Sequence, residues 1–241
     1  MVGMDIETIL YEEMDLVDPV AVIGFPSIGL TSSIMANMYV KSLDMKPIAG
    51  MASPSMPPYC LVTESCVMPP VRFYGYKNKR KNGRDVILCM TEYAPKPEDC
   101  YVLVNKVLRF LKLKGVKTII SMEGTPKFEN SCILAVAAGP NADKLMKKSG
   151  LECMREGMIR GFTGILLYEA PNMDMDIITI MVPATSGVPD PGSSVYFIEP
   201  ISRIVPGFKA PNKELLKEAE IIRRQMEEAQ HNVETTSQYI G

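Results

Sequence analysis

Residues 20–30 read VAVIGFPSIGL, and this short stretch decides the expected fold. Val20–Phe25 is an apolar run rich in β-branched residues, which is typical of a strand buried on both faces. The run passes into a glycine-containing turn, Gly24–Gly29, and we expect a helix over residues 30–43. A buried strand that leads through a tight turn into a helix is a basic unit of α/β folds.

Strand and helix patterns continue to alternate along the chain as far as residue 182. Further strands are expected at residues 7–12, 48–53, 71–76, 86–91, 116–121, 133–138 and 177–182, and further helices at 100–114 and 141–149. The segment 157–167 mixes glycine with apolar residues and fits either a strand or a closely packed helix. The alternation predicts an α/β fold with a mostly parallel sheet, covered by helices on both faces.

The C-terminal residues differ in character from this core. After Pro211, a helix is expected over residues 212–230, with apolar side chains at alternating steps of four and three: Leu215, Ala219, Ile222, Met226 and Ala229. This seam fits either packing against the chain's own core or contact with a partner helix. We therefore divide the chain into an α/β core domain, residues 1–211, and a C-terminal helix with a polar tail, residues 212–241.

The charge balance gives no reason to expect a nucleic acid or a membrane surface as a partner. The 241 residues carry 26 Lys and Arg against 28 Asp and Glu, which gives a formal net charge of −2. The basic stretch Lys77–Arg84 fits a solvated hairpin loop better than a nucleic-acid site, because no other part of the chain adds to it. No apolar run approaches the ~20 residues that span a bilayer.

The rare residues disfavour the common kinds of catalytic centre. The one histidine, His231, lies in a polar C-terminal segment, so a Ser-His-Asp, Cys-His or histidine-rich zinc site is not expected. The six cysteines form no C-x-x-C pair, and the acidic N-terminus lacks the features of a signal peptide. We therefore expect reduced thiols, a cytoplasmic location, and no metal or cofactor.

Two features of the core are candidates for binding a small ligand. The turn after the first buried strand, with Gly24, Ser27 and Gly29, exposes backbone N–H groups where an anion could sit. It matches neither a dinucleotide-binding turn nor a P-loop, and packing of strand against helix is the competing interpretation. Acidic residues near expected strand ends are the second feature, since ligands bind at the carboxyl ends of parallel strands. These residues are Glu64, Glu92, Glu123 and Glu169.

Taken together, several stretches in collinear order resemble the archaeal branch of the proteasome assembly chaperone family. They are VAVIGFPSIGLTSSIMANMYV (20–40), MPPVRFYGYKN (68–78), ILCMTEYAPKPEDCY (87–101), GVKTIISMEG (115–124), MKKSGLECMREGMIRGFTGILLYEA (146–170) and the helix at 212–230. The resemblance implies a single three-layer α/β domain that forms homo-oligomers, without an established catalytic centre. It also implies a role in assembling or engaging the 20S proteasome core.

The C-terminal tail departs in one respect from what the resemblance implies. Proteasome-binding tails of such proteins can place a tyrosine next to the last residue, whereas here Tyr239 is followed by Ile240 and Gly241. The terminal carboxylate is thus displaced by one residue from the expected docking geometry.

Two hypotheses of different classes follow from the sequence. The first is a non-enzymatic proteasome assembly chaperone or proteasome-interacting factor that acts as a homo-oligomer. Its partner-binding residues would be Leu215, Ile222, Met226, Tyr239 and Ile240. The alternative is a small-molecule-binding α/β enzyme, a hydrolase or transferase that uses Glu92 and Glu123 with the Gly24–Gly29 turn. The two hypotheses differ in whether the turn and the carboxylates converge on one pocket.

Overall fold

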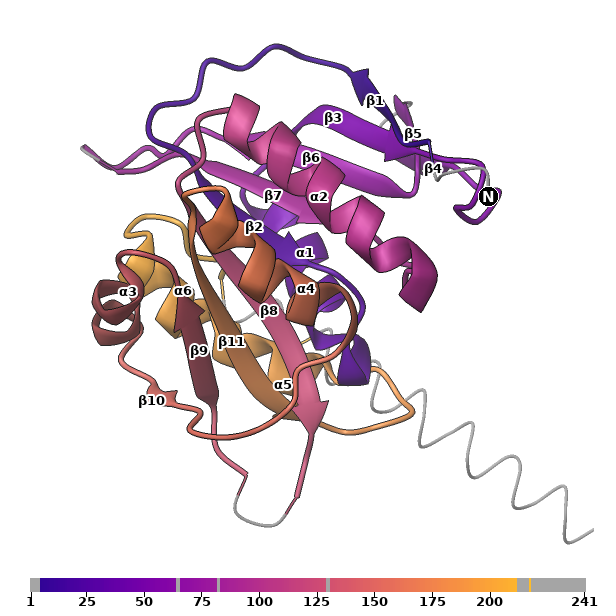
Figure 1. Cartoon of the computed structure of the whole chain (residues 1–241). Coiled ribbons are helices and arrows are strands. Elements are labelled where there is room, and N and C mark those ends of the chain that lie inside the picture. Colours follow the sequence, from indigo (N-terminus) through magenta and orange to yellow (C-terminus); the bar gives the residue numbers. More distant parts are fainter. Residues whose placement is uncertain (1–4, 64–65, 82, 129–130, 212–216, 218–241) are drawn as a thin grey trace, which may run out of the picture.

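The computed structural model describes residues 5–63, 66–81, 83–128, 131–211 and 217. Within these residues, nine strands form one sheet in the order β1-β3-β6-β7-β2-β8-β11-β9-β10. Their bounds are β1 Glu7–Leu10, β2 Val20–Gly24, β3 Lys46–Ala52, β6 Val71–Tyr76, β7 Val86–Met90, β8 Thr118–Pro126, β9 Leu134–Ala138, β10 Glu152–Cys153 and β11 Asp176–Ala184. A separate hairpin, β4 (Leu61–Thr63) with β5 (Cys66–Met68), projects beside β1 and β3 (Figure 1).

The sheet is mixed, and the prediction of a mostly parallel sheet was wrong. The central strands β7, β2, β8 and β11 run parallel to their neighbours in this group. At one end β1, β3, β6 and β7 pair antiparallel, and at the other end β9 pairs antiparallel with β11. For β6 and β7 the physical reason is the length of the connection. The loop 77–85 is too short for the helical crossover that a parallel pair requires.

Helices cover both faces of this sheet and make three layers (Figure 1). The helices are α1 Thr31–Ser42, α2 Pro97–Leu113, α3 Ala142–Ser149, α4 Gly161–Asn172, α5 Pro191–Ser194 and α6 Ile198–Ile204, with two 3-10 turns, η1 Ile28–Leu30 and η2 Val195–Phe197. Side chains of α1, α3 and α6 pack on one face, and those of α2 and α4 pack on the other.

The central strand β2 shows why both faces are covered. Its five residues are all buried, as expected for an apolar run without alternation. Val20 and Val22 belong to the core under α1, while Ala21 and Ile23 belong to the core under α2 and α4. The strand therefore contributes to two hydrophobic cores, one on each side of the sheet.

Most expected helices are confirmed, with two differences. The ambiguous segment 157–167 belongs mainly to α4, whose side chains Phe162, Leu166 and Ala170 are buried. The segment from Pro191 to Ile204, which contains α5, η2 and α6, was not predicted to be helical. Its two prolines and one glycine are typical of a loop, yet Ile198, Ile201 and Ile204 are buried in the core under α1. The expected helix at 212–230 lies outside the described residues, apart from Lys217.

Candidate functional site

The turn after β2 is filled by its own side chains. Ser27 Oγ lies 2.6 Å from Ser32 Oγ and 3.4 Å from Thr31 Oγ1. Ser32 Oγ in turn donates to the carbonyl oxygen of Met122 on β8, at 2.8 Å, and Thr31 Oγ1 donates to the carbonyl oxygen of Ile28, at 3.2 Å. These hydroxyl groups satisfy one another and tie the turn to the neighbouring strand.

Glycines in and beside this turn allow close packing of strand and helix. A Cβ on Gly24 would lie 2.5 Å from Ala36 Cβ on α1, so a side chain there would push the helix away. Gly29 has φ +66, a left-handed conformation that favours glycine, and its carbonyl oxygen accepts a hydrogen bond from the Asp190 N–H at 2.7 Å. Gly24, Ser27 and Gly29 therefore lie together where β2, α1 and the start of α5 pack against one another. We call this packed region the joint.

Asp190, which the sequence analysis did not single out, organises the other side of this joint. Its carboxylate accepts hydrogen bonds from the Thr185 N–H, the Ser193 N–H and the Ser193 hydroxyl group, each at 2.9 Å. Burial alone would raise the pKa of Asp190, but these hydrogen bonds outweigh it and lower the pKa. The signal was present in the sequence, because Asp followed by Pro is typical of a helix start.

Glu123 lies within β8, on the opposite face of the sheet from the turn. It accepts a hydrogen bond of 2.6 Å from the Thr163 hydroxyl group in the first turn of α4. Burial raises the pKa of Glu123 to about 7, and the hydrogen bond from Thr163 acts in the other direction. Its neighbour Met122 belongs to the core under α1, and side chains alternate between faces along a strand. The carboxylate therefore does not meet Ser27 or Gly24.

Glu92 has a different role, since it neutralises a buried arginine. Arg72 of β6 is 3% exposed, and its Nη2 donates to Glu92 Oε1 in an ion pair. Among the described residues, Arg72 Nε and Nη1 have no hydrogen-bond partner of good geometry. Burial raises the pKa of the nearby Tyr74 hydroxyl group, which the charge of Arg72 partly offsets. Loss of Glu92 would leave a buried charge without its counter-ion, which is costly.

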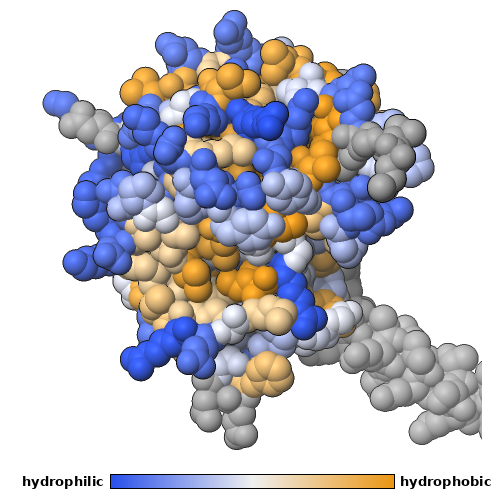
Figure 2. Space-filling model, in the orientation of Figure 1, coloured by the Kyte–Doolittle hydropathy of each residue, from blue (hydrophilic) through white to orange (hydrophobic). Residues whose placement is uncertain are grey.

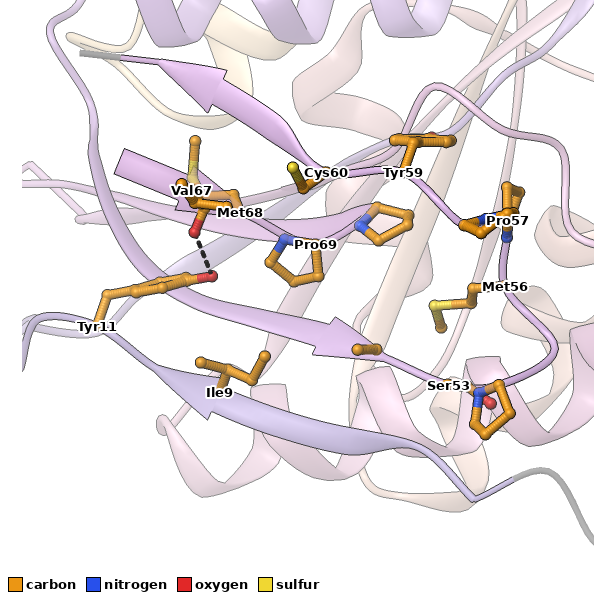
Figure 3. Close-up of a pocket in the computed structure, with 14 residues that line it drawn as sticks. Ile9, Tyr11, Ser53, Met56, Pro57, Tyr59, Cys60, Val67, Met68 and Pro69 are labelled. Carbon is orange, nitrogen blue, oxygen red and sulfur yellow. Dashed lines mark hydrogen bonds between the residues drawn. The ribbon is translucent and has the colours of Figure 1, made fainter. Parts of the chain in front are cut away.

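A surface hollow lies between the β4–β5 hairpin and the edge of the sheet. We call it the Tyr–Pro pocket; its cavity volume is ≈ 620 Å³. Figure 3 shows Ile9 and Tyr11 on the side of the first strand, facing Val67, Met68 and Pro69 of the hairpin region. The Tyr11 hydroxyl group donates to the Val67 carbonyl oxygen at 3.4 Å. The lining is mostly apolar, which suits apolar side chains.

A second hollow lies beside α4, and we call it the α4 hollow. Its cavity volume is ≈ 320 Å³, and its lining combines apolar residues such as Met154, Ile159 and Leu167 with the charged Arg155 and Glu156. Met158, next to it in the chain, is 74% exposed. Figure 2 shows hydrophobic residues gathered on the lower half of the same face. Exposed apolar surface of this kind often marks a contact with another protein.

The candidate residues thus do not converge on one pocket. The turn, Glu123 and Glu92 each have partners on different elements, and Glu169 lies within α4 and not at a strand end. Glu64 lies outside the described residues, as do the predicted partner-binding residues Leu215, Ile222, Met226, Tyr239 and Ile240. Sequence reasoning missed the two hollows, because their linings come together from several distant segments.

The described residues hold neither a metal centre nor a membrane-spanning helix. No group of three or more His, Cys, Asp or Glu is placed there to hold a metal ion. None of the helices in the described ranges combines the length and the apolar character that crossing a membrane requires.

The fold and these surfaces define a three-layer α/β protein whose polar side chains are paired between elements and whose surface includes the two hollows. The chain belongs to the PAC2 family, whose family model matches residues 21–230. A curated relative, the uncharacterized protein MJ0106 of Methanocaldococcus jannaschii, is 22% identical over 218 residues, which are 90% of this chain and 87% of that protein.

Solved structures have the same fold over nearly the whole chain. Pyrococcus furiosus PbaA, described as an archaeal homolog of proteasome-assembly chaperone, has a TM-score of 0.80 at 24% identity and covers 98% of this chain and 95% of its own. Pyrococcus furiosus PbaB, described as an archaeal proteasome activator, has a TM-score of 0.79 at 23% identity, with coverages of 95% and 98%. A PAC2 family protein of Streptomyces avermitilis has a TM-score of 0.66 at 14% identity, with coverages of 88% and 95%.

Proposed function

We propose that this protein is a non-enzymatic proteasome-interacting factor, either an assembly chaperone or an activator-like protein. The observation that carries the proposal is membership of the PAC2 family, together with the fold shared with PbaA and PbaB. Both of those proteins are described by a relation to the proteasome. The partner of this chain would accordingly be the 20S core or its subunits.

The geometry of the core supports contact over catalysis. The hydroxyl groups of the turn bond to one another and to Met122, and Glu92 is paired with Arg72. A catalytic centre needs polar groups that converge on one place where a substrate can bind. Here the polar groups hold elements together, while the lining of the Tyr–Pro pocket is mostly apolar.

We further propose that the α/β core self-associates and that the C-terminal segment contacts the proteasome. The exposed apolar surface beside α4, with Met158 and the α4 hollow, supports self-association. The apolar seam of Leu215, Ile222 and Met226 and the tail residues Tyr239 and Ile240 support a role of the last residues in partner contact. A repeated tail in an oligomer would bind with enhanced avidity.

The direct test combines this protein with proteasome subunits of the same source organism. We expect the full chain to co-elute with α-subunits, or with assembled 20S particles, in size-exclusion chromatography at micromolar concentration. Faster formation of 20S particles from separate subunits would identify a chaperone, and faster peptide hydrolysis by finished particles would identify an activator. Absence of co-elution with both subunits and particles would refute the proposal.

A truncation locates the contact. A chain shortened after Val233 should retain its fold and self-association but lose proteasome binding. The single substitution Tyr239→Ala should weaken binding, whereas the neighbouring Gln238→Ala serves as the matched control. Undiminished binding by the truncated chain would place the contact on the retained residues, in the α/β core or in the seam of Leu215, Ile222 and Met226.

A further inference from the structure

The first strand leaves one side of the sheet open. β1 lies at the end of the nine-stranded order, and its four residues, Glu7–Leu10, are all exposed. The Tyr11 N–H donates to the Ile48 carbonyl oxygen of β3 at 3.0 Å. Backbone groups alternate in direction along an antiparallel strand, so those of Thr8 and Leu10 point outward. An open edge of this kind is a template for a further strand.

Side chains of β1 alternate between two hollows, one on each face of the sheet. Ile9 and Tyr11 line the Tyr–Pro pocket (Figure 3). Thr8 and Leu10 line a groove against α2, which we call the α2 groove, with a cavity volume of ≈ 510 Å³. Figure 1 shows α2 lying along the face of the sheet beside β1. A strand added to this edge would place its own side chains alternately over the two hollows.

The two hollows differ in charge, and this difference determines which side chains of an added strand would fit each hollow. The Tyr–Pro pocket presents tyrosine, proline and methionine side chains. The α2 groove combines the apolar Phe110 and Leu113 with Lys106, Arg109 and Lys114, and no acidic side chain of the described residues lines it. Leu113 is 86% exposed.

The cations of the α2 groove lie near one acidic side chain of this chain, Asp5, which lines an adjoining hollow with Lys106 and Arg109. Lys106 and Arg109 form no ion pair within the described ranges. The Lys114 ammonium group lies 6.0 Å from the centre of the Phe110 ring. Carboxylates of an added strand would be attracted to these three positive charges, with a strength that falls as salt increases.

We propose that the β1 edge binds an extended segment of a partner protein in which apolar and acidic residues alternate. Backbone hydrogen bonds to Thr8 and Leu10 give affinity, and the two hollows select the side chains. The apolar residues enter the Tyr–Pro pocket and the acidic residues lie over Lys106 and Arg109. This binding mode is independent of the proposed proteasome contact through the C-terminal segment.

A second copy of this chain fits the edge less well. If two β1 strands paired antiparallel about a two-fold axis, each face of the joined sheet would carry the same residues from both strands. The second copy would place its own Ile6, Thr8 and Leu10 on the side of the α2 groove. These three side chains carry no carboxylate for Lys106 and Arg109, and the second copy would bring a second set of cations close to the first.

The test uses the full chain and labelled synthetic peptides, with binding measured by fluorescence anisotropy. We expect a peptide of alternating valine and glutamate to bind. Two control peptides should bind at least roughly tenfold more weakly. The first has the same composition with its valines and glutamates in separate blocks, so it loses the alternation between the two hollows. The second alternates valine with lysine, so it loses the attraction to the cations. Equal binding of the alternating and the block peptides would overturn the proposal.

Two sets of variants test the edge and its charge separately. Thr8→Pro removes an outward N–H that β3 does not use and should weaken peptide binding roughly tenfold, while Thr8→Val, which keeps the N–H, should not. Reversal of charge by Lys106→Glu with Arg109→Glu should transfer preference to the valine–lysine peptide. Unchanged binding by folded Thr8→Pro would overturn the proposal. The proposal would also be overturned if the valine–glutamate peptide did not bind and the chain formed a dimer that Thr8→Pro dissociates. The edge would then bind a second copy of the chain.

Discussion

Gly124 is the residue at which the joint between β8 and the turn has least room. A Cβ there would overlap the Ile28 carbonyl oxygen and lie 2.6 Å from Thr31 Oγ1. Gly124→Ala should therefore force the turn away from the sheet and lower the free energy of unfolding by about 1–3 kcal/mol. Urea denaturation measures the change. Gly192→Ala is the matched control, because its nearest neighbour, Asp190 Oδ1, would lie at an ordinary 3.5 Å.

Glu123 makes stability depend on pH near neutrality. Burial raises its pKa in the folded protein to about 7, compared with 4.5 for an exposed glutamate. Between these values the folded protein holds a proton that the unfolded chain has released, so stability falls as pH rises through this window and levels off above it.

Replacement of this carboxyl group should remove the effect. In Glu123→Gln the free energy of unfolding should no longer fall as pH rises through this window. At pH 8 it should exceed that of the native chain by at most about 3 kcal/mol. Thr163→Val removes the hydrogen bond that lowers the pKa of Glu123, so it should move the window to higher pH. Thermal unfolding between pH 5 and about 8 measures both variants. The same decline in Glu123→Gln would show that another group is responsible.

At the scale of elements, Phe208 helps to hold the segment that follows β11 against the core. Phe208 is fully buried and stacks on Tyr39 of α1, with ring centres 4.3 Å apart. Phe208→Ala should open a cavity between α1 and the end of α6 and lower the free energy of unfolding by about 3–5 kcal/mol. Tyr196→Ala, at a position 54% exposed, should change stability by less than about 0.5 kcal/mol. Equal effects in a denaturation experiment would contradict this account.

The sequence predicted elements well where periodicity and length agreed. α2 and β2 were identified because one has regular apolar spacing and the other a dense apolar run. α5 and α6 were missed, since short helices that contain proline and serine resemble loops until tertiary packing stabilises them. The direction of the outer strands also escaped prediction, because alternation of elements does not reveal which loops are too short for a crossover.

Site residues were harder to predict than elements. The Gly24–Gly29 turn was noted together with its competing interpretation, and the structure shows it as a packed joint. Arg72 gave no signal, because a single arginine in a strand pattern looks like a solvent-facing residue, although it is 3% exposed. The hollows depend on side chains from Ile9 to Pro70 and from Thr8 to Lys114, a proximity that no local pattern reveals.

For the whole molecule, the proposed self-association makes a prediction about the face beside α4. Met158→Asp places a charge on its exposed apolar surface, and the cost of burying that charge should shift the protein to a smaller species. Light scattering coupled to size-exclusion chromatography measures the mass. Leu113→Asp, an exposed substitution on α2, should leave the mass unchanged. An unchanged mass in Met158→Asp would remove this face from the self-association interface.

The arrangement of the central strands also governs how the chain must fold during its synthesis. β2 lies between β7 and β8, so Val20 finds its neighbours Val86 and Thr118 much later in the chain. The β6–β7 hairpin can form as soon as it leaves the ribosome. β2 emerges earlier, but it cannot pair with β8 until that strand has been synthesised. An apolar strand in a growing chain is thus exposed for much of translation. We therefore expect the yield of this protein in cells to depend on general chaperones more strongly than its final stability would suggest.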